Sequence, residues 1–98
     1  MQLIPTSKEL LKVFLQDLPR EPGIYKFLNE RKLTIYIGKA KNLKNRVPSY
    51  FQESNDKTKK IKNMIRESKF LEIALTKNEL EALLLEQYLI KEIKPKFN

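Results

Sequence analysis

The fold is decided by the stretch PGIYKFLNERKLTIYIGKA, residues 22–40, in which two short runs of branched and aromatic residues flank a polar centre. Residues 24–28 and 33–37 are typical of β-strands, and residues 29–32 between them are typical of a turn. The sequence therefore predicts a β-hairpin. Its ends read Gly-Ile-Tyr and Tyr-Ile-Gly, and they hold both glycines of the chain and two of its four tyrosines.

These two triplets are near mirror images of each other. If the strands pair symmetrically about the loop at 29–32, Tyr25 falls opposite Tyr36. Gly23 then falls opposite Gly38, and because side chains alternate along a strand, all four positions share one face. That face would present two phenols beside a patch without side chains, which a polymer backbone could approach closely. The same residues also suit ordinary structural roles, since glycines flank turns and tyrosines fit half-buried strands.

The rest of the chain alternates between helical patterns and one more strand. Helices are predicted over residues 8–14, 57–67 and 77–93, with a short basic helix that Asn42 caps and that ends before Pro48. Thr76 and Glu79 match a capping box for the last helix, and residues 70–75 form the third predicted strand. The fold class is therefore mixed α/β, more strictly α+β, with a small sheet of about three strands flanked by helices. We expect a single domain over residues 1–98, with an N-terminal helix in 1–17 and a core in 18–98.

The composition excludes several kinds of chemistry. The chain has no cysteine and no histidine. Disulfides, thiolate or imidazole metal ligands, cysteine nucleophiles and a histidine base are therefore absent, and a general base must be a carboxylate, a lysine, a tyrosine or metal-bound water. The lack of cysteine fits a reducing cytosol, so a cytoplasmic location is expected. We predict no secretory signal and no membrane-spanning segment.

Positive charge is concentrated in one part of the chain. The net charge is +8, and residues 39–69 contain ten Lys or Arg against three Asp or Glu. Such a cluster favours binding to a polyanion such as DNA. The alternative is a solvated face on which lysines maintain solubility.

One carboxylate interrupts the apolar side of the last predicted helix. The residues three and four positions away from Glu86, which are its neighbours on a helix surface, are all apolar: Ala82, Leu83, Leu89 and Ile90. A buried carboxylate must be protonated, paired or bound to a cation. Glu86 is therefore a candidate sole protein ligand for Mg²⁺ or Mn²⁺, and the alternative is a buried ion pair with Lys or Arg.

Three further residues near the second strand have chemistry suited to phosphate. Lys39 directly follows Tyr-Ile-Gly, and a cation near Tyr36 would favour the phenolate, so that a tyrosine could act as a general base. Arg46 has a planar donor fork that matches phosphate, and Tyr50 follows shortly after it. Lys41 and Lys44 are interpreted as solvated or phosphate-contacting charges.

Taken together, PGIYKF, IYIGKAKNLKNRVPSYF and KNELEALLLEQYLIKEIKPKFN resemble the GIY-YIG nuclease family. From about residue 18 to residue 98, the chain is similar to the N-terminal nuclease domains of the UvrC family of bacterial nucleotide excision repair. The resemblance implies a small twisted sheet, antiparallel in its central part and flanked by helices. It also implies metal-dependent hydrolysis of one DNA phosphodiester on the 3′ side of a lesion.

The resemblance also implies roles for individual residues. The catalytic set would be Tyr25, Tyr36, Lys39, Arg46, Tyr50 and Asn98. Glu86 would hold one Mg²⁺ or Mn²⁺ ion, one of the motif tyrosines would be the base or would position water, and Asn98 would support the site by hydrogen bonding. DNA contacts are predicted at Gly38, Lys41, Lys44, Lys57 and Lys60.

The implied partners are damaged double-stranded DNA and a UvrB-like helicase, the latter bound through regions outside this chain. The isolated domain is expected to be a monomer cut from a longer protein. Two alternatives stay open. One is a stand-alone repair, restriction or homing nuclease of the same superfamily, and the other is a DNA-binding module without catalysis.

Overall fold

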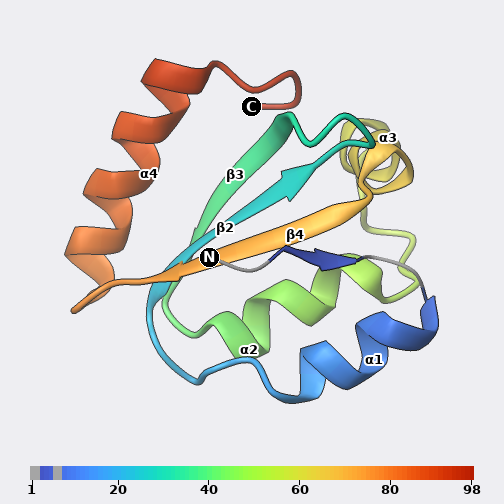
Figure 1. The fold of residues 1–98 in the computed structure, drawn as a ribbon, viewed down its shortest axis with the longest axis horizontal. Coiled ribbons are helices and arrows are strands. Elements are labelled where there is room, and N and C mark those ends of the chain that lie inside the picture. Colours follow the sequence, from blue (N-terminus) through green and yellow to red (C-terminus); the bar gives the residue numbers. More distant parts are fainter. Residues whose placement is uncertain (1–2, 6–7) are drawn as a thin grey trace.

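The structure is a computed structural model that describes residues 3–5 and 8–98. Its centre is a four-stranded antiparallel sheet in the order β1-β4-β2-β3 (Figure 1). The strands are β1 (Ile4–Pro5), β2 (Gly23–Leu28), β3 (Thr34–Ala40) and β4 (Phe70–Leu75). The three predicted strands are confirmed. The fourth, β1, was not predicted, because a strand of two residues is too short to show a periodic pattern.

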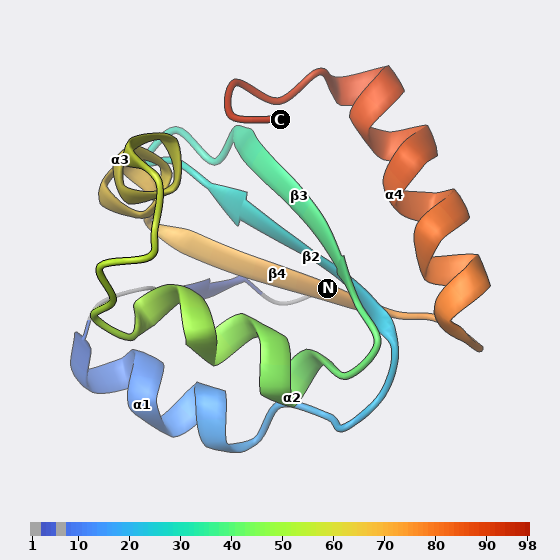
Figure 2. The same ribbon diagram turned by 180° about the vertical axis from the view of Figure 1, so that it is seen from behind.

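Helices flank this sheet. They are α1 (Lys8–Gln16), α2 (Leu43–Arg46), the 3₁₀ helix η1 (Val47–Phe51), α3 (Lys59–Glu67) and α4 (Glu79–Ile93). Figures 1 and 2 show α4 flanking β3 on the side away from α1 and α2. The four predicted helices are confirmed, with their ends shifted by a few residues, as is the end of α2 before Pro48. No described helix is long and apolar enough to cross a membrane.

An aromatic core lies between one face of the sheet and the segment α2–η1. Phe27 is completely buried at its centre, and its ring lies 5.3 Å from that of Tyr50 and 5.9 Å from that of Tyr25, measured between centroids. Leu43 and Val47 are also fully buried in this cluster. Such edge-to-face pairs favour one arrangement of the rings, so this core fixes where the tyrosine hydroxyls lie.

Alternation along the strands places a second set of side chains on the other face, toward α4. Ile24 and Ile37 are 2% and 1% exposed, and Ala82 of α4 is fully buried. The face of α4 that holds Ala82 therefore packs on the sheet, as its apolar pattern predicts. The opposite side of this helix leaves Leu84 and Tyr88 exposed.

Side chains fix the helix starts, and one start differs from the prediction. Asn42 caps α2 by accepting a hydrogen bond from the Asn45 N–H, as predicted. The capping box predicted at Thr76 and Glu79 is wrong. Asn78 is the cap, accepting from the Glu81 N–H at 2.8 Å, whereas the Thr76 hydroxyl donates to the Asn78 carbonyl. The chain is still extended at Asn78, so α4 begins two residues later than predicted.

The predicted pairing of the β2–β3 hairpin is also wrong. Tyr25 pairs with Gly38, and Tyr36 pairs with Phe27. A loop at 29–32 would pair Leu28 with Leu33, but in the structure Leu33 pairs with Asn29, which shifts the register by one residue. A β-bulge between Phe27 and Leu28 then shifts it by one more residue. Two single-residue shifts restore the original alternation, so the motif tyrosines and glycines still share one face.

Candidate active site

The two glycines make room for packed neighbours. A Cβ on Gly38 would lie 2.3 Å from the Tyr25 ring, and a Cβ on Gly23 would lie 2.4 Å from the Ala74 carbonyl oxygen. The prediction of a bare face open to a polymer backbone is therefore wrong. Gly38 is buried under the Tyr25 ring, so its contribution is to let this ring approach β3 closely.

The side chains of Tyr25, Tyr50 and Arg46 converge at one place. The hydroxyl groups of Tyr25 and Tyr50 are 2.6 Å apart and share a hydrogen bond, and Arg46 Nη2 donates to the Tyr50 hydroxyl at 3.2 Å. The Arg46 guanidinium also lies 5.0 Å from the centre of the Tyr50 ring. Tyr36 joins the group, with its ring centroid 6.1 Å from that of Tyr50. The sequence prediction that these four residues share a site is supported by this arrangement.

The phenols of this cluster hold their protons tightly. Burial, followed by the neighbouring Tyr50 hydroxyl, raises the pKa of Tyr36 to about 12. Burial, together with the Tyr25 hydroxyl, likewise raises the pKa of Tyr50 to about 12. Burial also raises the pKa of Tyr25, although its hydrogen bond with Tyr50 opposes this shift. The protein residues alone therefore favour neutral phenols that donate and accept hydrogen bonds.

The prediction that Lys39 makes Tyr36 a phenolate is wrong for the protein residues alone. The pKa of Tyr36 is raised, for the reason given above. Alternation along β3 directs Lys39 to the opposite face from Tyr36. Lys39 instead lines a polar hollow of about 660 Å³ together with Arg46. It lies at the edge of the site, where its charge can attract phosphate.

The structure brings the predicted metal ligand toward the phenols. Glu86 is half-buried on α4, and its charge is near enough to Tyr36 to contribute to the raised pKa of that phenol. Within residues 3–5 and 8–98, the ion pairs are Lys26–Glu72 and Lys96–Glu67, so the alternative of a Glu86–Lys or Glu86–Arg pair is not found there. The carboxylate is therefore available to a cation.

The side chain of Asn98 forms hydrogen bonds with the backbone of the edge strand β3. Its side-chain oxygen accepts from the Ile37 N–H and its side-chain N–H donates to the Ile37 carbonyl, both at 2.8 Å. The Phe97 N–H donates to the Ile35 carbonyl at 2.9 Å. Ile37 lies between Tyr36 and Gly38, so these bonds join the tail to the Tyr-Ile-Gly strand, and the role predicted for Asn98 in the active site stays a prediction.

The lysines predicted to contact DNA are not gathered in one place. Lys41 lines the polar hollow beside Arg46. Lys44 donates to the Gln16 carbonyl at the end of α1, and Lys57 donates to the Gln52 carbonyl, so both have structural contacts. Lys60 is exposed on α3.

The polar hollow also contains residues to which the sequence analysis assigned no role in the site. Glu79, Asn42 and Asn45 line it together with Lys39, Lys41 and Arg46. Glu79 lies seven residues, or two helical turns, before Glu86 on α4. This spacing places both carboxylates on the same side of the helix and was the signal that could have identified Glu79.

A hard divalent cation fits the residues present. No group of three or more acidic, histidine or cysteine side chains gathers anywhere in the described part of the chain. A lone carboxylate whose charge reaches Tyr36 suits Mg²⁺, which takes oxygen ligands and retains several waters when the protein supplies few. Glu86 is the residue that would hold such an ion.

Comparisons with known proteins agree with this geometry. Residues 21–98 match the family model of the UvrC-like GIY-YIG domain. The chain is 41% identical to UvrABC system protein C of Salinibacter ruber over 99% of its own length, and 49% identical to that of Legionella pneumophila over 90%. It spans only 15% and 14% of the length of these two proteins.

A solved structure matches the whole fold. The GIY-YIG N-terminal endonuclease domain of UvrC from Thermotoga maritima, bound to its catalytic divalent cation, magnesium, is 42% identical to this chain. The match has a TM-score of 0.80 and covers 94% of this chain and 99% of that domain. Tyrosine-to-phenylalanine and asparagine-to-alanine variants of the same domain have also been solved with the catalytic cation. The chain described here belongs to the UvrC-like GIY-YIG domain family.

Proposed function

We propose that this chain is a divalent-metal-dependent DNA endonuclease domain that hydrolyses one phosphodiester bond on the 3′ side of a lesion. The observation that carries the proposal is the convergence of Tyr25, Tyr50 and Arg46, with Tyr36 and Glu86 beside them. Donors for phosphate oxygens and a lone carboxylate for a cation are the parts that phosphodiester hydrolysis requires.

Each side chain has a distinct task in this proposal. Arg46 is exposed and interacts with both Tyr50 and Tyr25, and the outer donors of its guanidinium bind a phosphate oxygen and stabilise charge that develops there. The neutral hydroxyls of Tyr25 and Tyr36 position the attacking water and the phosphate. Lys39 and Lys41 attract the neighbouring part of the DNA strand.

Glu86 holds one Mg²⁺ or Mn²⁺ ion in this proposal. When bound, such an ion polarises a phosphate oxygen as a Lewis acid and stabilises the transition state. The magnesium reported for the Thermotoga domain supports this choice of metal.

The biological setting is also part of the proposal. Damaged double-stranded DNA is the substrate, and a UvrB-like helicase loads the nuclease through regions outside this chain, as the similarity to UvrABC system protein C supports. The 98 residues form one domain of a longer protein, with the helix-containing segment 1–17 preceding the core 18–98, and the isolated domain is a monomer. Because bacterial DNA lies in the cytoplasm, we place the protein there.

Incision of a lesion-bearing duplex tests this function. The duplex is incubated with the longer protein that contains this domain in Mg²⁺, in Mn²⁺ and in EDTA, with and without a UvrB-like loading partner. We expect a single nick on the 3′ side of the lesion that needs metal. Glu86→Gln should lower the incision rate by about a hundredfold or more while changing DNA affinity less than about threefold, because it removes the metal ligand and no DNA contact.

Glu92→Gln is the matched control, since Glu92 is an exposed acid on the same helix. It should cut at the wild-type rate. A Glu86→Gln variant that cuts as fast as Glu92→Gln would remove the metal assignment. DNA binding without incision under any of these conditions would instead favour the non-catalytic binding module.

A further inference from the structure

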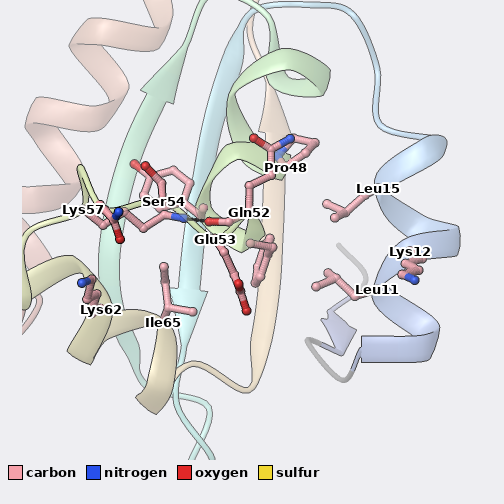
Figure 3. A pocket seen from close by; sticks show the side chains of 13 residues that line it. Leu11, Lys12, Leu15, Pro48, Gln52, Glu53, Ser54, Lys57, Lys62 and Ile65 are labelled. Atoms are coloured by element: carbon pink, nitrogen blue, oxygen red, sulfur yellow. Dashed lines mark hydrogen bonds between the residues drawn. The ribbon is translucent and has the colours of Figure 1, made fainter.

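A cavity lies against Tyr50, between α1 on one side and α3 with the 52–57 segment on the other (Figure 3). Its volume is about 930 Å³, within the range of pockets that hold small ligands. Tyr50 belongs to both sites: it lines this cavity, and its hydroxyl bonds to Tyr25 and Arg46 in the candidate active site. A molecule in the cavity would therefore contact a side chain that also belongs to the candidate active site.

The walls of this cavity suit a flat, apolar group. Figure 3 shows Leu11 and Leu15 projecting from α1 toward it, with Ile65 of α3 on the facing side. Phe51 adds an aromatic ring that is only partly buried. This ring is held in place by Phe27, whose centroid lies 5.8 Å away. A fixed, partly exposed aromatic ring is what a stacked base requires.

The polar residues around the cavity identify the kind of molecule that would enter. Three lysines line it against one acid: Lys12, Lys57, Lys62 and Glu53. The amides and hydroxyl of Gln52, Asn55 and Ser54 also line it and offer both donors and acceptors. Lysines attract phosphates, and amides pair with the edges of bases, so the cavity combines the elements that bind an unpaired nucleotide.

We propose that this cavity takes one nucleobase, splayed out of the DNA strand whose phosphodiester lies at the Tyr25–Arg46 cluster. The inference rests on the proposed function, because it needs DNA as the substrate. An acidic apolar segment of a partner protein would meet the same leucines and lysines. The shared Tyr50 side chain favours the base, since it places the cavity next to the Tyr25–Arg46 cluster, where the DNA strand would lie.

DNA affinity tests this inference without any incision. Gapped duplexes leave several nucleotides unpaired around the cut position, and each unpaired base in turn is replaced by an abasic sugar. Affinity for the 98-residue chain is measured in EDTA. At one position the abasic sugar should weaken binding by about 5- to 100-fold, which is the range for losing one stacked base, and at the others it should have little effect.

Paired substitutions show whether the dependence of DNA affinity on one base arises at the cavity. Leu15→Trp fills the cavity and should abolish the dependence on that base, whereas Val13→Trp, at a position that is 58% exposed on the same helix and does not line the cavity, should keep it. Lys62→Glu should weaken binding more than Lys59→Glu. Both lysines are exposed on α3 and the charge change is the same, but only Lys62 lines the cavity. The lysine pair does not alter the core, so it remains informative even if Leu15→Trp misfolds.

Each outcome decides the inference. Equal affinity at every abasic position, the same base dependence in Leu15→Trp and Val13→Trp, or equal weakening by Lys62→Glu and Lys59→Glu would each overturn it. A flat scan with normal incision overturns the base cavity and leaves the proposed function intact. If one abasic position weakens binding but the incision assay in Mg²⁺ and Mn²⁺ shows no cutting, the base cavity is supported and the nuclease assignment is overturned.

Discussion

At the scale of single residues, Tyr50 connects the parts of the candidate site. Its ring packs against Phe27 in the core, and its hydroxyl meets Tyr25 and Arg46. The same burial that positions this hydroxyl disfavours its ionisation, because a phenolate would lose its water. The placement of the site and its protonation state therefore have one physical cause.

The burial of Tyr50 predicts that the stability of the chain depends on pH. The pKa of Tyr50 is about 12 in the folded chain and 10.0 for an ordinary tyrosine. The unfolded chain thus releases this proton first, so the stability from the neutral phenol is complete below pH 10 and is lost as the pH rises from 10 to 12. In Tyr50→Phe, the free energy of unfolding should fall less steeply across that window, as measured by urea denaturation in EDTA.

Tyr88→Phe provides the control for this measurement. Tyr88 is 60% exposed on α4, so its removal should leave the wild-type slope unchanged. Equal slopes for the two variants would show that burial of Tyr50 does not shape the alkaline unfolding.

Gly38 gives a second prediction at this scale. Gly38→Ala puts a Cβ 2.3 Å from the Tyr25 ring, so the ring must move or the strand must shift. We expect a loss of about 1–3 kcal/mol in the free energy of unfolding, and slower incision because the Tyr25 hydroxyl leaves its place. In a Tyr25→Ala background the same substitution should cost much less. Equal costs in both backgrounds would contradict the packing explanation.

At the scale of elements, the hairpin shows why a face can be predicted when a register cannot. The sequence indicated two strands and a polar turn, and these are confirmed. The turn closes one residue later than predicted, and a bulge shifts the pairing once more. Each shift alone would have sent Tyr36 to the wrong face, and together they restore it. Neither a β-bulge nor the φ of a turn residue leaves a periodic signal in the sequence, so the register of the hairpin could not be predicted.

The turn itself yields a prediction. Lys32 has a φ of 63°, in the left-handed region that favours glycine, while Asn29 accepts hydrogen bonds from the N–H groups of Arg31 and Leu33. Lys32→Gly should therefore raise the free energy of unfolding by about 0.5–1 kcal/mol. Arg31→Gly, at an ordinary φ, should lower it by a similar amount. Chemical denaturation measures both, and a Lys32→Gly variant less stable than wild type would contradict the argument.

The tail that closes β3 can be tested by hydrogen exchange. Asn98→Ala removes both bonds to the Ile37 backbone, and the Ile37 amide should then exchange at least about tenfold faster. Lys96→Ala breaks only an exposed ion pair with Glu67, so it should leave Ile37 exchange unchanged. Identical protection of Ile37 in both variants would mean that the tail does not hold the strand.

At the scale of the whole molecule, the net charge of +8 predicts salt-dependent DNA binding. Lys41, like Lys39, lines the polar hollow beside Arg46, so it is placed to meet a phosphate. In duplex DNA, the slope of log affinity against log salt should become shallower by about 0.9 in Lys41→Ala, the value of one phosphate contact. Lys91→Ala, on α4, should keep the wild-type slope. A salt titration followed by fluorescence anisotropy separates the two.

For the molecule as a whole, part of the structure could be predicted from the sequence and part could not. It predicted the fold class, the helices and three strands, because periodic patterns are visible in one dimension, and it singled out Glu86, whose charge reaches Tyr36, as a carboxylate within an apolar pattern. It missed the purpose of Gly38, which depends on the Tyr25 ring lying across it. It also missed the cavity at Phe51 and the direction of the tyrosine pKa shifts, since both arise from side chains brought together by several elements.

The contacts of Phe97 and Asn98 with β3 have a consequence for how the chain is made. The strand that carries Tyr36 is fastened by residues about sixty positions further along. During synthesis the β2–β3 hairpin leaves the ribosomal exit tunnel before Phe97 and Asn98, so it lacks their contacts until these two residues follow. The candidate site around Tyr36 is therefore assembled only after residues 97 and 98 have emerged.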